Sequence, residues 1–356
     1  MSNPHQRFLD LHDQTELLVM PTVWDAASAR MAQACGAQAV GTSSAALAWS
    51  CGHADGGLLP VQTLLHRVTQ IVRSTTLPVT VDIEDGYSAD PQAVAALVQD
   101  LAGLGVVGIN IEDGDGEPDL LIAKIAEVRQ TLGSRPMFIN ARTDVYLRGL
   151  AEGEAAIRMS AGRLQAYARA GAHGAFVPGM QHPHEIRALA GQISLPLNVM
   201  WLPRMPSNAA LHTAGVRRLS AGPAIFLHAW ASASAATRAL LAGTLSAADP
   251  SADYATLNAL FAEPDDAAFI ASVLGVVARA RNIADLARTT GIARETLYKM
   301  LRGEGNPTMG NLSKLAKSLG FRLSLVPIDG NGKPAKPKPK PKPARKAGKL
   351  AAKNVA

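Results

Sequence analysis

The chain has 356 residues, of which 47% are hydrophobic and 18% are charged, so it exceeds one ordinary domain and is too apolar to be a disordered protein. Its net charge of +6 is unevenly distributed. Residues 1–263 hold 17 Lys/Arg and 23 Asp/Glu (net −6), residues 264–329 hold 9 and 6 (net +3), and residues 330–356 hold 9 and 0 (net +9). Only the C-terminal quarter therefore has the charge that suits a nucleic-acid partner.

The cysteine content and the apolar stretches indicate the compartment. Two cysteines, Cys35 and Cys51, are too few for a disulfide framework or a four-ligand zinc site, and they suit a reduced cytoplasm. The N-terminus is polar, and the longest apolar stretch, residues 223–245, is interrupted by His228 and Arg238. We therefore expect a cytoplasmic protein with no signal peptide and no membrane span.

In the first 230 residues, short β-branched runs alternate with Ala/Leu-rich stretches of helical spacing. The eight runs are 17–21, 39–42, 78–83, 106–111, 137–141, 175–177, 197–200 and 216–220. This alternation predicts parallel strands joined by crossover helices, and eight repeats match an α/β fold of the (β/α)8 TIM-barrel type. A doubly wound open sheet is the less favoured alternative, because no G-x-G-x-x-G turn follows the first run.

Acidic residues follow two neighbouring runs, at the strand ends where barrels carry their chemistry. Asp82 and Glu84 are two residues apart on the third strand, and Glu112 lies at the matching height on the fourth, so all three are expected to face the barrel centre. Such acids repel one another unless a cation compensates them, and oxygen ligands favour Mg²⁺ or Mn²⁺. Loop or helix-capping roles are the competing interpretation, equally favoured for three acids farther into the loops, Asp85, Asp113 and Asp144.

Other polar groups at the same end suit an anionic ligand. Arg142 follows the fifth run and can bind a carboxylate through two parallel hydrogen bonds. The turn Thr42-Ser43-Ser44 offers hydroxyls and backbone N–H groups. Trp24 ends the first strand and Asn198 the seventh. Together these residues predict a Mg²⁺ site for a small α-keto or enol acid.

Several segments resemble the isocitrate lyase/phosphoenolpyruvate mutase superfamily over residues 5–245. The resemblance is carried by residues 24–30 (Trp-Asp-Ala-Ala-Ser-Ala-Arg), by Thr42-Ser43-Ser44, by Asp55-Gly56, and by residues 81–87, 108–113 and 139–144. It implies a (β/α)8 barrel whose final helix is often swapped between subunits, in homodimers or homotetramers. It also implies that the family's members cleave or form C–C bonds next to a keto acid, or rearrange a C–P bond.

The resemblance further implies roles for individual residues. Asp82 would bind Mg²⁺, with Glu84 and Glu112 acting largely through waters, and the metal would stabilise an enolate. Arg142 would contact the substrate, and Asp55 would stand near the reacting centre. The substrate carboxylate would lie against Thr42, Ser43 and Ser44.

One loop departs from the family pattern. The lyases carry a Lys-Lys/Arg-Cys-Gly-His loop here, whereas residues 113–119 read Asp-Gly-Asp-Gly-Glu-Pro-Asp, and the longer lid of the mutases is also absent. This argues against a standard isocitrate or methylisocitrate lyase. Cys51 and His53 are less favoured substitutes for the missing acid/base. The reaction is left open, and so is ligand binding without turnover.

Residues 283–301 change to a helix-turn-helix pattern, with one helix that ends at Gly291 and a second that begins near residue 293. The polar side of the second helix suits base and phosphate contacts through Arg294, Glu295, Tyr298 and Lys299. Residues 265–327 closely resemble the helix-turn-helix antidote proteins of toxin–antitoxin modules, which implies sequence-specific DNA binding by a dimer. A helical cap for the barrel is the alternative.

The tail at 333–343 is a Lys-Pro repeat that cannot fold, so it is expected to be a disordered cationic arm that neutralises DNA phosphates, or else a solubilising tail. The predicted domains are a barrel (1–247), a linker (248–263), a helix-turn-helix domain (264–328) and the tail (329–356). The predicted function is a Mg²⁺-dependent carbon–carbon lyase or phosphonomutase-like enzyme tethered to DNA. The alternatives are a metabolite-sensing transcriptional regulator with a non-catalytic barrel, and a C-terminal module that only mediates assembly.

Overall fold

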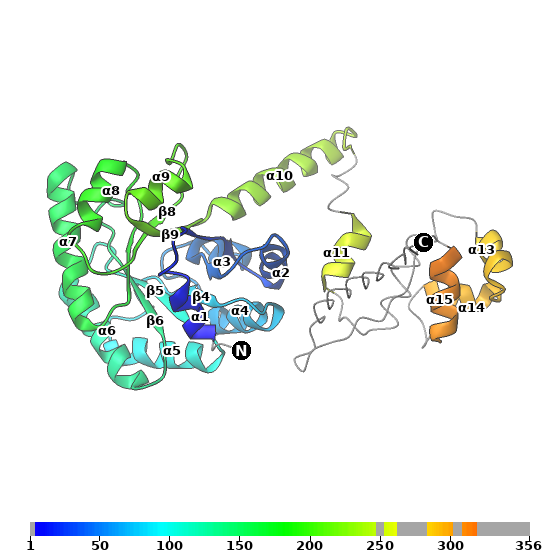
Figure 1. The fold of residues 1–356 in the computed structure, drawn as a ribbon, viewed down its shortest axis with the longest axis horizontal. Helices are drawn as coiled ribbons and strands as arrows, with labels where there is room; N and C mark the ends of the chain where they lie inside the picture. The colour runs from blue at the N-terminus through cyan, green and yellow to red at the C-terminus, as the bar shows by residue number, and fades with distance from the viewer. Residues whose placement is uncertain (1–3, 247–252, 262–282, 302–307, 319–356) are drawn as a thin grey trace, which may run out of the picture. The chain divides into compact units, whose positions relative to one another are not determined.

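The computed structural model describes residues 4–246, 253–261, 283–301 and 308–318. Its chain divides into two compact units, residues 1–261 and 262–356. The first unit contains nine parallel strands in the order β1-β9-β8-β7-β6-β5-β4-β3-β2, which form a nearly closed barrel (Figure 1). The strands are β1 (Leu18–Met20), β2 (Thr22–Val23), β3 (Val40–Thr42), β4 (Val79–Asp82), β5 (Gly108–Glu112), β6 (Phe138–Arg142), β7 (Gly174–Val177), β8 (Leu197–Met200) and β9 (Val216–Ser220). The predicted (β/α)8 fold class is confirmed.

The first predicted strand is divided at Pro21, which has no N–H to donate to a neighbouring strand. On one side of the proline, β1 pairs with β9, and on the other side β2 pairs with β3. This division brings the first and last parts of the barrel together, and the side chain of Thr22 donates a hydrogen bond to the carbonyl of Gly222 (2.5 Å).

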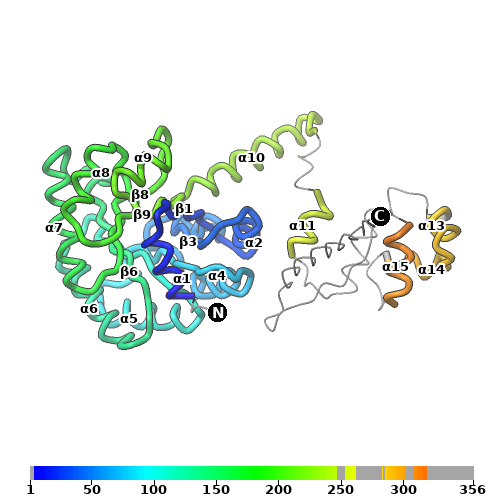
Figure 2. Tube along the Cα trace, viewed as in Figure 1, coloured from blue at the N-terminus to red at the C-terminus, as the bar shows by residue number. Residues whose placement is uncertain are grey.

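Helices surround the barrel, and most of them cover the outward faces of its strands, whereas the last two of this unit do not (Figure 2). They are α1 (Pro4–Asp10), α2 (Ala26–Ala34), α3 (Ser44–Ser50), α4 (Val61–Ser74), α5 (Pro91–Gly103), α6 (Pro118–Leu132), α7 (Gly153–Ala170), α8 (Pro183–Ala190), α9 (Asn208–Thr213), α10 (Ala224–Leu241) and α11 (Tyr254–Phe261). Local signals place their ends. Asp25 and Ser28 form a capping box at α2, and Asp90 caps α5 ahead of a proline.

The strand alternation separates two environments. On β5, Ile109 and Ile111 belong to the core between sheet and helices, whereas Asn110 joins a polar network of strand side chains. At the amino-terminal ends of the strands, Phe8 of α1 is fully buried in a second cluster with Phe138. Burying a side chain of this size stabilises a fold by roughly 2 kcal/mol. The polar end of the barrel is therefore the opposite, carboxyl end.

Helix α10 differs from the other barrel helices because it extends away from the barrel (Figure 1). Its first turn is anchored by buried Phe226, but large apolar side chains farther along it are exposed, among them Trp230 (64% exposed) and Leu241 (83%). Across the described residues, no helix is both long and apolar enough to cross a membrane.

The second unit contains α13 (Ile283–Thr290), α14 (Arg294–Leu301) and α15 (Met309–Ser318). Its small core consists of Leu286, Ile292, Leu297, Met300, Leu312, Leu315 and Ala316. Gly291 has a positive φ of 68°, which glycine adopts without strain, and it turns the chain between α13 and α14. The predicted helix–turn–helix order is present here. The Lys-Pro tail and two parts of the predicted linker, residues 248–252 and 262–263, lie outside the described residues, whereas helix α11 lies within that linker.

Candidate active site at the carboxyl end of the barrel

The first of two cavities at the carboxyl end of the barrel, here called the inner cavity, has a volume of about 230 Å³. Six of the residues predicted for the site line it together: Thr42, Ser43, Ser44, Asp55, Asp82 and Arg142. They come from β3, α3, β4, β6 and one loop, so the barrel assembles residues that are far apart in sequence. The cavity is smaller than the roughly 300–1,000 Å³ of sites for drug-sized ligands, which suits a small acid.

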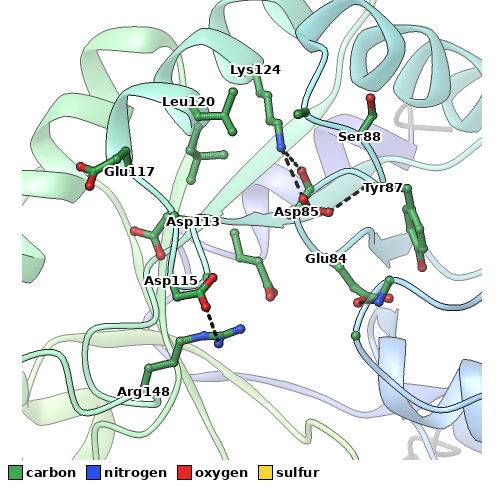
Figure 3. Close-up of a pocket in the computed structure, with 17 residues that line it drawn as sticks. Glu84, Asp85, Tyr87, Ser88, Asp113, Asp115, Glu117, Leu120, Lys124 and Arg148 are labelled. Carbon is green, nitrogen blue, oxygen red and sulfur yellow. Dashed lines mark hydrogen bonds and ion pairs between the residues drawn. The ribbon is translucent and has the colours of Figure 1, made fainter.

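The second cavity, here called the acidic cavity, has a volume of about 470 Å³ and contains Glu84 and Glu112 (Figure 3). Most other charged groups in its wall are acids as well: Asp85, Asp113, Asp115 and Glu117. Its two cations are held by carboxylates or carbonyls. Lys124 Nζ donates to the carbonyl of Asp85 (2.7 Å), and Arg148 lies 3.5 Å from Asp115.

Asp82 is the most firmly held of the predicted metal ligands. It is the last residue of β4, and its N–H donates to Thr42 Oγ1 (2.9 Å). Its Oδ1 accepts from the N–H of Glu84 (3.1 Å), and its Oδ2 accepts from Asn110 Nδ2 (3.1 Å). These bonds fix the carboxylate at the boundary between the polar strand network and the inner cavity.

Glu84 does not share a strand face with Asp82, so the alternation argument was wrong for it. Strand β4 ends at Asp82, and Glu84 has a positive φ of 52° in the following turn. Its carbonyl accepts from the N–H of Glu112 (2.9 Å), and its carboxylate accepts from the N–H of Gly57. This turn, rather than strand geometry, brings Glu84 and Glu112 into one cavity.

Arg142 is held in a fixed orientation by two acids. Its Nε and Nη2 donate to the two carboxylate oxygens of Asp144 (2.6 and 2.9 Å), and it forms an ion pair with Glu112. Asp144 is fully buried. A guanidinium restrained in this way is preorganised for a ligand in the inner cavity, because little side-chain entropy is lost on binding.

The acids of the site carry poorly compensated negative charge. Burial raises the pKa of Asp82 and of Glu84 above their ordinary values, and it raises the pKa of Glu112 to about 8. The charge of Arg142 opposes the shift at Asp82 and Glu112, whereas the other acids of the site add to it. This donor set of carboxylates fits a hard divalent cation. Among the described residues, no three His, Cys, Asp or Glu side chains form a group that could hold a metal ion. Asp82 lines the inner cavity, whereas Glu84 and Glu112 line the acidic cavity.

Four of the residues considered from the sequence lie away from both cavities. The ring of Trp24 packs edge-on against Phe226 of α10, with centroids 5.1 Å apart. Asn198 is buried in the strand network, where it bonds Asn140 and Ser220. Cys51 and His53 line neither cavity.

Among the lining residues of the inner cavity that the sequence analysis did not single out, Arg218 is the one that carries a charge. Arg218 of β9 is fully buried and forms part of the cavity wall. The sequence did contain a signal for it. Arg218 is two residues from Ser220, which also lines the inner cavity, and residues two apart on a strand share a face. The signal was weak because the adjacent residue is also an arginine, Arg217, and two consecutive arginines suggest an exposed stretch of chain.

The residues predicted to contact DNA share one exposed surface of α14. Arg294, Glu295, Tyr298 and Lys299 are all exposed, whereas Leu297 and Met300 on the same helix are buried. Lys299 lies 3.4 Å from Glu295 one turn away. The helix therefore presents a polar face with a buried apolar side, as expected of the second helix of a helix-turn-helix.

The fold and the acids at its carboxyl end define a member of a (β/α)8 enzyme superfamily. Residues 8–241 match the family described as "Phosphoenolpyruvate phosphomutase". The chain therefore belongs to this family, which is part of the phosphoenolpyruvate mutase/isocitrate lyase superfamily. Residues 241–327 match a second family, described as "Probable addiction module antidote protein". Both resemblances seen in the sequence are confirmed.

Individual relatives agree with this assignment. An uncharacterised protein of Mycobacterium tuberculosis is 37% identical over 66% of this chain and 89% of its own length. The crystal structure of a candidate phosphonomutase from Burkholderia cenocepacia is 38% identical, with a TM-score of 0.64 over 67% of this chain and all of its own. An oxaloacetate decarboxylase of Paraburkholderia xenovorans is 27% identical over 68% of this chain and 83% of its own length. A phosphonopyruvate hydrolase solved with oxalate and Mg²⁺ shares the fold (TM-score 0.64, 20% identity, 72% and 94% coverage).

Proposed function

We propose that the barrel is a Mg²⁺-dependent enzyme that cleaves a C–C bond of a small 2-oxo or dicarboxylic acid through an enolate. The observation that carries this proposal is the convergence of Asp55, Asp82 and Arg142 on one small cavity beside Glu84 and Glu112. The relative that decarboxylates oxaloacetate and the shared fold of the hydrolase solved with oxalate and Mg²⁺ support this substrate class.

Each residue of the two cavities has a separate role in the proposed reaction. Asp82 would hold the cation, with Glu84 and Glu112 bonded to its waters. Bound Mg²⁺ supplies positive charge where negative charge develops on the substrate's 2-oxo oxygen. Arg142, restrained by Asp144, orients the substrate, and the Thr42-Ser43-Ser44 turn binds its carboxylate. Asp55, in the wall of the same cavity, would transfer a proton at the reacting carbon.

A screen of the purified full chain with Mg²⁺ tests the reaction. We expect release of pyruvate or glyoxylate from at least one of oxaloacetate, 2-methylisocitrate and dimethylmalate. Asp82→Asn should lose both turnover and the rise in Tm that Mg²⁺ causes, whereas Asp100→Asn, which removes an exposed carboxylate on α5, should keep both. Ligand-dependent stabilisation without any turnover would contradict the enzyme.

The second candidate is a metabolite-sensing transcriptional regulator whose barrel binds its ligand without turnover. It is favoured by residues 113–119, which contribute acids and glycines to the wall of the acidic cavity where the lyases carry a Cys loop. In this case the ligand would change DNA affinity, so DNA binding measured with and without oxaloacetate separates the two candidates.

We further propose that the second unit binds DNA through α14, with the Lys-Pro tail adding non-specific affinity. The exposed face with Arg294, Tyr298 and Lys299 supports this role, as does the antidote family match. The double variant Arg294→Ala/Lys299→Ala should weaken duplex binding by at least tenfold and reduce its salt dependence. Arg158→Ala on α7 is the matched control, and an unchanged affinity in the double variant would overturn the assignment.

A further inference from the structure

The buried Arg218 has no ion-pair partner among the described residues, unlike Arg142 and Arg163 at the same end of the barrel. Arg142 pairs with Asp144 and Glu112, and Arg163 pairs with Asp113 at 2.8 Å. For Arg218 no carboxylate of the described chain lies within ion-pair distance, and its Nε and Nη1 have no hydrogen-bond partner there. A buried charge with unpaired donors costs several kcal/mol unless an opposite charge compensates it, so this residue needs an explanation.

The surroundings hold Arg218 in place. It lies on β9 in register with Leu18 of β1 and Asn198 of β8. Its Nη2 donates to Asn110 Oδ1 (3.2 Å), and that oxygen also accepts from Asn140 Nδ2 (2.9 Å). The orientation of the Asn110 amide is fixed because its Nδ2 donates to Asp82. Asn110 therefore links the unpaired cation directly to the predicted metal ligand.

Arg218 lies in the wall of the inner cavity, so a ligand that enters this cavity can compensate the charge of its guanidinium. Arg218 and Arg142 both belong to the cavity wall, on β9 and β6. Burial lowers the pKa of Arg218 to about 9 and the charge of Asp82, which is not in ion-pair contact, partly opposes this shift, so the guanidinium is still charged at neutral pH. An anionic group that enters the cavity would meet one guanidinium already neutralised by protein acids and one that is not.

We propose that Arg218 is a specificity-determining residue that binds a second carboxylate of the substrate, so that the enzyme selects dicarboxylates over monocarboxylic 2-oxo acids of similar size. This inference rests on the proposed function of the same cavity, and it narrows the substrate class. One carboxylate lies at the Arg142 side and the other at Arg218. The volume of about 230 Å³ limits the chain between them to a few carbons.

Two probes that differ only in one charge test the proposal on the full chain with Mg²⁺. Succinate carries two carboxylates, and succinamate replaces one of them with an amide of the same shape. A charge-assisted hydrogen bond is worth enough for a preference of about tenfold to hundredfold, so the wild-type protein should bind succinate that much more tightly in calorimetric titrations. Equal binding of the two probes overturns the proposal.

Variants then assign the preference to Arg218. Arg218→Gln should bind the two probes within about twofold of each other and keep its affinity for succinamate. Arg217→Gln is the matched control, because it removes the same charge from the adjacent, half-buried residue that bonds the carbonyl of Val216, and it should keep the preference. Arg218→Met removes the buried charge without adding a polar group, and it provides the same comparison if the glutamine variant does not fold.

The outcomes separate this inference from the proposed reaction. If Arg218→Gln or Arg218→Met still prefers succinate over succinamate, another group binds the second carboxylate and the proposal is overturned. If a small inorganic anion compensates Arg218 instead, added chloride would stabilise the protein and succinate would show no preference, which also overturns the proposal. If the protein turns over a substrate but binds succinate and succinamate equally, only this inference is contradicted. If it prefers succinate but turns over no substrate, only the proposed reaction is contradicted.

Discussion

Asp113 stabilises the loop after β5 through four hydrogen bonds to one carboxylate. Its oxygens accept from Thr143 Oγ1 (2.7 Å), the N–H of Asp144 (2.9 Å), Arg163 Nη1 (2.8 Å) and the Tyr167 hydroxyl (2.7 Å). Arg163 and Tyr167 belong to α7, so the carboxylate connects the end of β5 to a distant helix. The sequence left Asp113 open between a place in the acidic site and a loop or helix-capping role, because these donors are far away along the chain.

We expect Asp113→Ala to lower the free energy of unfolding by about 3–5 kcal/mol, because it leaves the Arg163 charge unpaired in a largely buried site. The measurement is urea unfolding followed by circular dichroism. The control is Asp115→Ala, two residues away, whose side chain is 82% exposed and should change stability by less than about 0.5 kcal/mol. Equal effects at the two positions would contradict the role of Asp113.

At the scale of elements, the strands could be predicted closely, whereas the turn after β4 could not. The runs at 197–200 and 216–220 match β8 and β9 residue for residue, because Pro196 and Gly215 mark where these two strands begin. The turn after β4 has no such signal, since a non-glycine residue, Glu84, adopts the left-handed conformation there. A prediction from alternation therefore found the acids of the site but not their arrangement.

The position of Trp24 shows a second limit of sequence reasoning. The residue follows the short β2 strand, but its ring lines neither cavity and packs instead against Phe226 on a helix about 200 residues away. Only the closed barrel brings these elements together. Residues whose role depends on such long-range packing, including Asn198 and Arg218, could not be assigned from local pattern.

Helix α10 supports a prediction about assembly. Leu227, Trp230 and Leu241 are each at least half exposed, and exposed apolar surface of this extent marks interaction sites. We expect the protein to be a homodimer or homotetramer through α10. Trp230→Asp should weaken self-association by tenfold or more, since buried tryptophans contribute strongly to interfaces.

Size-exclusion chromatography with light scattering would show this change as a shift toward monomer at micromolar concentration. Met159→Asp, on the exposed side of α7, introduces the same charge at another apolar surface residue and should leave the assembly intact. If wild type is already a monomer, or if Trp230→Asp keeps the wild-type mass, α10 is not the interface.

At the scale of the whole molecule, the two units carry net charges of opposite sign. The barrel portion has a net charge of −6 and places several of its acids at one end, whereas residues 264–356 carry the excess of Lys and Arg. A duplex should therefore repel the barrel and attract the C-terminal portion, which favours binding in one orientation. The barrel's own pH dependence is set by buried histidines as well as by its acids.

His12 closes the amino-terminal end of the barrel and should make the fold sensitive to acid. Its ring stacks on Phe138 at 4.4 Å, and its Nδ1 bonds the carbonyl of Phe8 (2.9 Å). Burial, together with the nearby charge of Arg218, lowers the pKa of His12 to about 4, while the hydrogen bond to Phe8 opposes the shift. Because the folded state binds its proton less readily than the unfolded state, this stability is present above pH 6.5 and is lost as the pH falls toward 4.

The loss should amount to about 3 kcal/mol for His12, since one pKa unit corresponds to about 1.4 kcal/mol. Urea unfolding between pH 7.5 and 4 measures it. His12→Phe, which keeps an aromatic ring against Phe138, should flatten the slope in this window, whereas His66→Phe at an exposed position of α4 should not. The acids at the carboxyl end contribute to the slope equally in all three proteins, so the difference isolates His12. An identical slope in wild type and His12→Phe would mean that folding does not change the pKa of His12, which would contradict this prediction.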